Sequence, residues 1–168
     1  MPELMPAERL QPSLLDRLTD DDPASPRESR DQRFFDARRL RASVLRDLAW
    51  LLNATDGHCG PALADYPQAA RSTLNFGIPD LAGTTASRID AGELARRVKE
   101  AIVRYEPRIL REELSVKVIT QPESAGGLLL TMRIEGALWA TPAPLRIQVD
   151  TRFDLQSGRV FVADGAGR

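Results

Sequence analysis

The chain has 168 residues, of which 42% are hydrophobic and 28% charged, and this suits one compact unit with a packed core. Its 23 basic and 24 acidic residues leave a formal net charge of -1. We therefore expect no nucleic acid among its partners, because nucleic-acid binders normally carry a strongly basic face. One cysteine and one histidine argue against an internal disulfide and a multi-histidine metal site, and no cofactor is expected.

Membrane insertion is not expected either. The longest apolar runs, such as residues 48–52, are far shorter than the roughly 20 residues that a membrane helix needs. The N-terminus lacks the basic and then apolar pattern of a signal peptide, so we expect a cytoplasmic protein. All basic residues except Lys99 and Lys117 are arginines, whose planar guanidinium favours bidentate contacts with carboxylates.

Residues 1–35 are predicted to form an N-terminal arm with one short helix, and residues 36–168 a single α+β domain. In the arm, Ser13 is placed as an N-cap and Asp16, three residues later, completes a capping pattern. The predicted helix has an apolar face formed by Leu14, Leu15 and Leu18. Because so short a helix is marginal alone, this face is expected to dock on the domain or on a partner chain.

Three more helices are predicted from the apolar periodicity. The first covers residues 36–53. Its buried face would consist of Leu40, Val44, Leu48, Leu51 and Leu52. The second begins at Pro67, since proline is tolerated in a first turn, and ends before Gly77. The third covers residues 90–105, where Asp90 and Glu93 form a capping-box-like start.

After Pro107 the apolar period changes from helical to two, which predicts strands. The expected strands cover residues 114–118, 128–135, 145–153 and 160–162. Gly126-Gly127 is predicted to form the first turn, and residues 136–144 a longer connection. Helices followed by such a meander predict an α+β fold, with N-terminal helices packed on an antiparallel sheet of three to four strands.

Catalytic motifs are largely missing from the sequence. It contains no G-x-S-x-G elbow, no Walker-type phosphate loop and no C-x-x-C pair. His58 and Cys59 could act as base and nucleophile, but adjacent side chains seldom face each other productively. A loop without chemistry is the favoured interpretation, and no catalytic residue is assigned.

Paired carboxylates are the remaining enzymatic possibility. A glycosidase needs two carboxyl groups roughly 5 to 9.5 Å apart, and Glu135 and Asp150 both fall on the outer face of the predicted sheet. They are more simply read as exposed partners of the neighbouring arginines, since cross-strand charge pairs are common. These arginines are Arg133, Arg146 and Arg152.

A sharper feature lies between the last predicted helix and the first strand, at Glu106-Pro107-Arg108. Pro107 disfavours helical geometry at Glu106, so the chain must change direction there. The corner can then present a carboxylate and a guanidinium to a partner in a fixed relation. The alternative, which composition alone favours, is a helix-ending proline with incidental charges.

Six segments, taken in order, resemble one known family. They are Leu14-Leu15-Asp16-Arg17-Leu18, L-R-D-L-A-W-L-L-N at residues 45–53, Tyr66-Pro67, S-T-L-N-F-G-I-P-D-L at residues 72–81, Glu106-Pro107-Arg108 and Gly136-Ala137-Leu138-Trp139. Their order and spacing, from about residue 13 to 162, resemble the phage baseplate wedge proteins long labelled lysozyme-like. Within that family they resemble most the TssE-like baseplate subunits of type VI secretion systems.

The resemblance implies a structural role in a contractile apparatus docked at the inner face of the cell envelope. Glu106, Pro107 and Arg108 are expected to contact the bundle formed by the wedge subunits TssF and TssG, with TssK as a further candidate partner. The sheet is expected to accept a strand from the first ring of the TssB–TssC sheath and so to template sheath assembly. Further candidate partner contacts are Leu14, Leu15, Leu18, Arg146 and Arg152.

The residues themselves are compatible with strand addition. A meander of three or four strands has two open edges, and an added strand gains affinity through main-chain hydrogen bonds. An arginine-rich outer face would add charge complementarity. Two other functions stay open at this point: a peptidoglycan-cleaving enzyme that uses carboxylates such as Glu135 and Asp150, and a small regulatory adaptor on the same fold.

Overall fold

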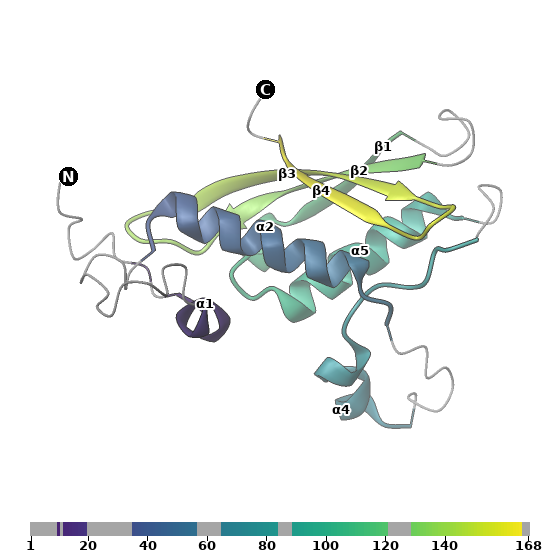
Figure 1. The fold of residues 1–168 in the computed structure, drawn as a ribbon, viewed down its shortest axis with the longest axis horizontal. Helices are drawn as coiled ribbons and strands as arrows, with labels where there is room; N and C mark the ends of the chain where they lie inside the picture. Colours follow the sequence, from purple (N-terminus) through teal and green to yellow (C-terminus); the bar gives the residue numbers. More distant parts are fainter. Residues whose placement is uncertain are drawn as a thin grey trace.

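A computed structural model describes residue 10 and residues 12–19, 35–56, 65–83, 89–120 and 129–165. The two long helices, α2 (Ala37–Asn53) and α5 (Ala91–Tyr105), pack on one face of a four-stranded antiparallel sheet (Figure 1), and the described helices precede the strands in the chain. The predicted α+β fold is therefore confirmed. The predicted loop at His58-Cys59 and the predicted turn at Gly126-Gly127 lie outside the described residues.

Side-chain caps set the starts of the helices. The α-helices are α1 (Leu14–Leu18), α2 (Ala37–Asn53), α4 (Pro67–Ala70) and α5 (Ala91–Tyr105). Ser13, Asp36 and Asp90 precede α1, α2 and α5, and each side chain accepts a backbone N–H from the first turn. The caps Ser13 and Asp90 fall where the sequence predicts them, whereas Asp36, predicted as the first helical residue, is the N-cap of α2.

The helix predicted from Pro67 is shorter than expected. It ends at Ala70, and a separate 3-10 helix, η3 (Thr73–Asn75), follows it. The break has a local cause, because the Ser72 side chain accepts a hydrogen bond from the backbone N–H of Leu74 and so starts a new helical turn. A second 3-10 helix, η5 (Arg111–Glu113), precedes the sheet.

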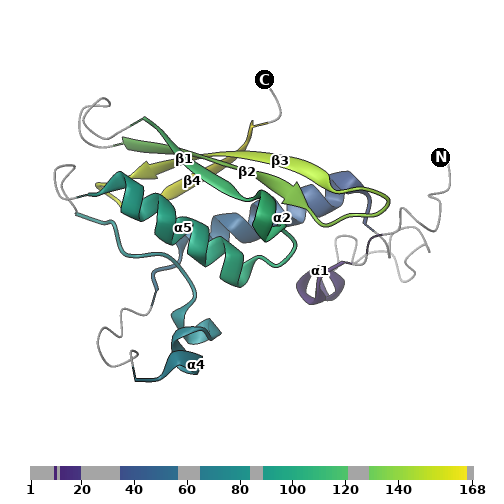
Figure 2. The same cartoon turned by 180° about the vertical axis from the view of Figure 1, so that it is seen from behind.

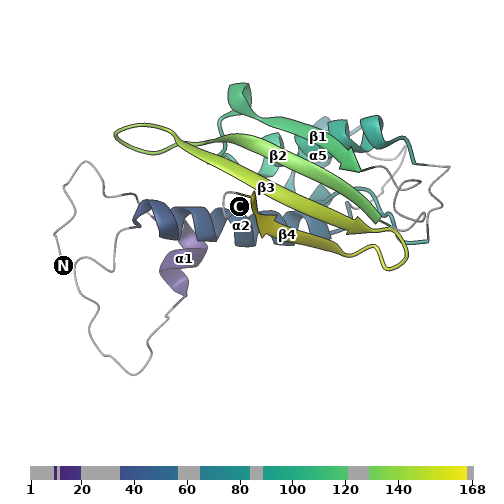
Figure 3. The same cartoon turned by 90° about the horizontal axis from the view of Figure 1, so that it is seen from above.

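The sheet is a meander in the order β1-β2-β3-β4 (Figure 2). Its strands are β1 (Ser115–Thr120), β2 (Leu129–Leu138), β3 (Leu145–Asp154) and β4 (Val160–Asp164). All three neighbouring pairs are antiparallel. Viewed from above, β1 and β4 form the two opposite edges (Figure 3).

The second strand is longer than the sequence predicts. Gly136 pairs with Ile147, and Leu138 pairs with Leu145, so the expected connection over residues 136–144 is wrong for its first three residues. A Cβ atom on Gly136 would lie 3.3 Å from Cγ2 of Ile109. The glycine therefore marks a close approach to the strand and not a turn.

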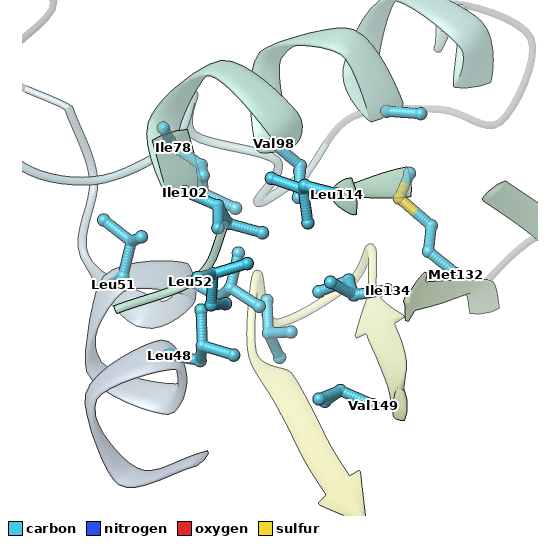
Figure 4. Packing of buried hydrophobic residues seen from close by; sticks show 14 of the residues in the cluster. Leu48, Leu51, Leu52, Ile78, Val98, Ile102, Leu114, Met132, Ile134 and Val149 are labelled. Carbon is cyan, nitrogen blue, oxygen red and sulfur yellow. The ribbon is translucent and has the colours of Figure 1, made fainter. Parts of the chain in front are cut away.

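One continuous core joins α2, α5 and the inner face of the sheet (Figure 4). All five residues predicted to form the buried face of α2 are buried: Leu40, Val44, Leu48, Leu51 and Leu52. The alternating apolar residues of β2 and β3 are buried as well, for example Met132, Ile134 and Val149. Burial of these side chains supplies the main favourable free energy of folding.

One residue of the predicted arm also reaches this core. Leu10 is buried and forms an isolated antiparallel bridge with Phe35. The N–H of each residue donates to the carbonyl oxygen of the other, at N···O distances of 3.2 Å and 2.8 Å. The boundary between arm and domain at residue 35 stays a prediction.

The segment before α5 is fastened to the end of α2 through Gly77. The backbone of Ile78 exchanges hydrogen bonds with Ala54 and Asp56, both at 2.9 Å. Gly77 has φ of +134°, and a Cβ there would lie 2.3 Å from the carbonyl oxygen of Ala54. Both the conformation and the lack of space therefore require glycine.

Gly77→Ala should lower the free energy of unfolding by about 3 kcal/mol or more, because it adds a backbone clash to the strain of positive φ. Gly83→Ala is the matched control. Gly83 also has positive φ, at +70°, but a Cβ there would meet nothing within 4 Å, so only about 1 kcal/mol should be lost. Urea unfolding of both variants checks this, and equal losses would contradict the steric account.

Candidate functional site

The corner at Glu106–Arg108 is fixed between α5 and the end of β2. Helix α5 ends at Tyr105, and Glu106 adopts φ of -121° and ψ of 78° ahead of Pro107, as a residue before proline must leave the helical region. The N–H of Leu110 then donates to the carbonyl oxygen of Ala137, at 2.8 Å, and the N–H of Trp139 donates to that of Arg108, at 2.7 Å. The corner is thus hydrogen-bonded to the C-terminal end of β2 and to the residue directly after it.

The two charged residues of the corner are bonded to each other. Arg108 donates from Nε to Oε1 of Glu106, at 2.7 Å, and from Nη2 to Oε2, at 2.5 Å. Its backbone N–H also donates to Oε1, at 3.2 Å. Glu106 is only 3% exposed. The charges are therefore not incidental to the turn, and it is the guanidinium and not the carboxylate that reaches the surface.

Helix α2 completes the surroundings of Arg108. Ser43 and Asp47 lie one helical turn apart, so they project from one side of the helix. The Oγ of Ser43 accepts from Nη1 of Arg108, at 3.1 Å, and Asp47 Oδ2 accepts from Nη2, at 2.5 Å. The guanidinium is thus bonded to Glu106 on one side and to α2 on the other, in the planar arrangement that arginine favours.

A further ion pair links this group to α1. The carboxylate of Asp47 also binds Arg46, whose Nε lies 2.8 Å from Oδ1. Arg46 Nη1 in turn donates to Asp16 Oδ1, at 2.6 Å, and Asp16 is held by its own N-cap, Ser13, at 2.6 Å. We call the series Glu106–Arg108–Asp47–Arg46–Asp16 the ion-pair chain. It connects α1, α2 and the corner.

Opposing effects set the pKa values along the ion-pair chain. Burial acts to lower the pKa of Arg108, but the hydrogen bonds and negative charges of Glu106 and Asp47 outweigh it and raise the pKa. Burial acts to raise the pKa of Asp16, yet the hydrogen bonds from Ser13 and Arg46 hold it below its ordinary value of 3.8. Both groups are therefore held in their charged forms.

The amphipathicity of α1 is inverted relative to an ordinary surface helix. Its acidic side faces the domain, where the Asp16 side chain is only 5% exposed. Its leucines face solvent, with Leu14 71% and Leu18 75% exposed. The sequence predicts that these leucines dock either on the body of the domain or on a partner chain. In the described structure they do not dock on the body of the domain.

Exposed aromatic residues flank the ion-pair chain. Arg46 lies over the ring of Trp50, with its guanidinium carbon 5.1 Å from the ring centroid. Trp139, whose backbone is bonded to Arg108, is 63% exposed. Large exposed aromatic side chains are enriched in protein interfaces, so this region has the composition of a partner-binding surface.

The two carboxylates considered for hydrolysis are engaged elsewhere. On the outer face of the sheet, Glu135 accepts from Lys117 at 3.0 Å and Asp150 from Arg133 at 2.7 Å. The structure thus favours the interpretation as exposed cross-strand charge pairs. Arg146 and Arg152 also lie exposed on this face, six residues apart on β3, and neither is part of the ion-pair chain.

A polar cleft of about 260 Å³ lies elsewhere, between α5 and the segment that contains Gly77. Neither Glu135 nor Asp150 lines it. Its charged residues include Arg96 and Glu100, which are bonded to each other. Within the described residues, no group of three or more histidine, cysteine, aspartate or glutamate side chains could hold a metal ion.

Sequence reasoning found the corner but missed its partners on α2. Ser43, Arg46 and Asp47 fall on the polar side of a helix, where exposed charges are ordinary. A usable signal is present, because Asp47 belongs to one of the segments that resemble the baseplate family and lies four residues after a serine on the same helical side. Nothing in the sequence alone pairs that side with Arg108, 61 residues away.

The comparisons with known proteins give one finding. A family model described as baseplate wedge protein gp25 matches residues 38–143, which is more than half of the chain and includes α2, α5, the corner and β2. No curated protein and no solved structure matches the chain significantly. None of the described helices has the length and apolar character that a membrane span requires.

A double-mutant cycle of Glu106→Gln and Arg108→Met should give a coupling energy of about 1–3 kcal/mol in urea unfolding. Arg108→Met leaves a buried carboxylate without its charged partner, and Glu106→Gln leaves the partly buried guanidinium without one of its carboxylates. Lys117→Met and Glu135→Gln form the matched control. Lys117 and Glu135 also form a salt bridge, but both side chains are far more exposed. Their coupling energy should therefore stay below about 1 kcal/mol. Equal coupling energies would contradict a structural role of the corner pair.

Arg46→Gln should raise the pKa of Asp16, since it removes a bonded positive charge while burial, which favours the neutral acid, remains. In the wild type the lowered pKa means that the tie to α1 is fully present above about pH 4 and is lost as the pH falls through that lowered pKa. An NMR pH titration of the Asp16 carboxyl measures the shift. Arg38→Gln, at an exposed position of α2, is the control, and an unchanged pKa in Arg46→Gln would rule out the tie.

Proposed function

Because the chain belongs to the family of the baseplate wedge protein gp25, we propose that it is the TssE-type subunit of a type VI secretion baseplate. The baseplate wedge family is structural, and the proposed role is to join the wedge subunits to the contractile sheath and to template sheath assembly. The observation that carries the proposal is the ion-pair chain, which holds the family's tripeptide in one fixed arrangement. The apparatus would act from the cytoplasmic face of the envelope.

The corner is the proposed contact for the TssF–TssG bundle. Arg108 reaches the surface beside the exposed side chains of Pro107 and Trp139. Glu106 is buried, so its role is to position the guanidinium and not to touch the partner. Because Ser43, Asp47 and Glu106 already fix the guanidinium, less side-chain entropy is lost on binding.

The leucines of α1 are the proposed second contact with the same wedge subunits. A short helix that is tied down by Asp16 and turns Leu14 and Leu18 to solvent gains little from folding alone. Burial of the two leucines against an apolar surface of a partner would stabilise the complex by the usual hydrophobic contribution. TssK is a further candidate for this contact.

A hydrolytic function receives no support from a specific arrangement of residues. Glu135 and Asp150 are each held by a basic side chain on the open face of the sheet. Turnover of peptidoglycan by the purified protein that Glu135→Gln abolishes would nevertheless overturn the structural proposal. Co-purification with a protease component in place of baseplate subunits would favour the adaptor.

Arg108→Ala and the double variant Leu14→Ser/Leu18→Ser should each weaken binding to purified TssF–TssG at least tenfold, which corresponds to about 1.4 kcal/mol. Glu106→Gln should weaken it too, through the loss of positioning. Lys99→Ala, an exposed charge on α5, and Leu74→Ser, at a leucine that is 78% exposed on η3, are the matched controls.

Pull-down and titration with the purified wedge complex measure these affinities, and circular dichroism confirms that each variant is folded. The controls should bind like the wild type. Wild-type affinity of both Arg108→Ala and the leucine variant would remove the assigned role of the corner and of α1.

A further inference from the structure

The two edges of the sheet differ in how their outward backbone groups are satisfied. In an antiparallel pair, alternate residues of an edge strand turn their N–H and C=O groups away from the sheet. Directly before β4, the carbonyl oxygen of Arg159 accepts from the backbone N–H of Asp154 on β3. By the period of two, Val160, Val162 and Asp164 therefore turn their backbone groups outward.

The first of these outward positions is closed by Asn53, the last residue of α2. Its Nδ2 donates to the carbonyl oxygen of Val160, at 2.8 Å, and its Oδ1 accepts from the N–H of Val160, at 3.0 Å. The side-chain amide thus makes the pair of hydrogen bonds that a residue of a neighbouring strand would make. Nothing further can pair with Val160 unless this amide moves away.

The other end of the same edge is also bound to α2. Arg41, near the start of the helix, makes a bidentate contact with the carboxylate of Asp164, at 2.6 and 2.7 Å. The same guanidinium donates to the carbonyl oxygen of Arg146, at 3.1 Å. Helix α2 therefore runs along β4 and is bonded to it at both ends (Figure 3).

The opposite edge, β1, is not closed in this way by any of the described residues. Among them, the hydrogen bonds to the backbone of β1 all come from the neighbouring strand of the sheet. The exposure of the side chains also differs between the two edges. Val116 and Val118 point to the core side but are only partly buried, whereas Val160 at the other edge is buried. Ile119 is 51% exposed.

We infer that β1 is the edge that accepts a strand from a partner and that α2 closes β4 against such an addition. The inference rests on the proposed function, in which a sheath subunit adds a strand to this sheet. The register of β1 shifts between Val118 and Thr120, so regular pairing extends over residues 115–118. Bulges of this kind limit how far an edge can be extended.

The geometry also sets the chemistry of the added strand. Its main chain would bond to the outward groups of β1, and its side chains would alternate between the two faces. On the core side, apolar residues would cover the exposed parts of Val116 and Val118. On the outer side, Lys117 is 62% exposed and would favour an acidic residue.

Photocrosslinking to purified TssB–TssC sheath subunits tests the edge directly. A p-benzoylphenylalanine replaces, one at a time, Lys117 and Ile119 on β1, and Phe161 and Ala163 on β4, all four of which are exposed. The inference predicts crosslinks to a sheath subunit from the two β1 positions and few or none from β4. Crosslinks from Phe161 and Ala163 alone would overturn it while leaving the proposed function intact.

Proline substitution gives a second test with a matched control. Of Val116 and Lys117, one N–H faces β2 and the other faces outward, and edge strands tolerate proline at the outward kind of position. Whichever of Val116→Pro and Lys117→Pro keeps a near-wild-type unfolding midpoint is the tolerated variant. That variant should bind sheath subunits at least tenfold more weakly than the wild type. Val162→Pro removes an outward N–H of β4 and should bind like the wild type.

The outcomes separate the edge assignment from the proposed function. Wild-type binding by the tolerated β1 variant, or a tenfold loss confined to Val162→Pro, would overturn the edge assignment. If neither β1 proline is tolerated, the crosslinks decide. If the unmodified protein fails to bind sheath subunits at all, although it binds TssF–TssG, the sheath-templating part of the proposed function fails and the inference fails with it.

Discussion

The bidentate pair between Glu106 and Arg108 is the interaction on which the proposed binding surface depends. It forms where a helix must end, because Pro107 removes helical geometry from the preceding residue, and it buries a carboxylate that would be costly without a partner. Once the pair exists, the guanidinium has free donors on one side only, and Ser43 and Asp47 of α2 occupy them. The end of one helix is thereby fixed against the side of another.

The same constraint extends outward to the N-terminal helix. Asp47 is shared between Arg108 and Arg46, and Arg46 binds Asp16. Since charges in the series alternate, each residue is held by the next, and α1 is anchored by its acidic side while its leucines remain exposed. The fold therefore uses polar bonds to hold its own parts together here and leaves apolar and aromatic surface for other chains.

Much of the fold could be predicted from the sequence, because the signals that set it are local. The N-caps at Ser13 and Asp90 and the two apolar periods are local signals, so the long helices, the presence of four strands and the α+β class followed from them. Gly136 misled because glycine signals a turn and a close approach equally well, and the nearby Ile109 that decides between them is distant in sequence. Likewise Asp47 and Asn53 look like ordinary helix-surface residues, and only the packed structure shows that one holds Arg108 and the other closes the edge of β4.

Hydrogen exchange of the wild-type protein, free and bound to purified TssF–TssG, reports on the corner and on α1 in one measurement without altering either, and so shows whether both contact the wedge subunits. If they do, backbone amides in residues 13–18 and 106–110 and at Trp139 gain protection, and β1 stays unchanged until sheath subunits are added. Binding of TssF–TssG that protects the outer face of the sheet or the polar cleft beside α5, and leaves the corner and α1 unchanged, would contradict these contacts.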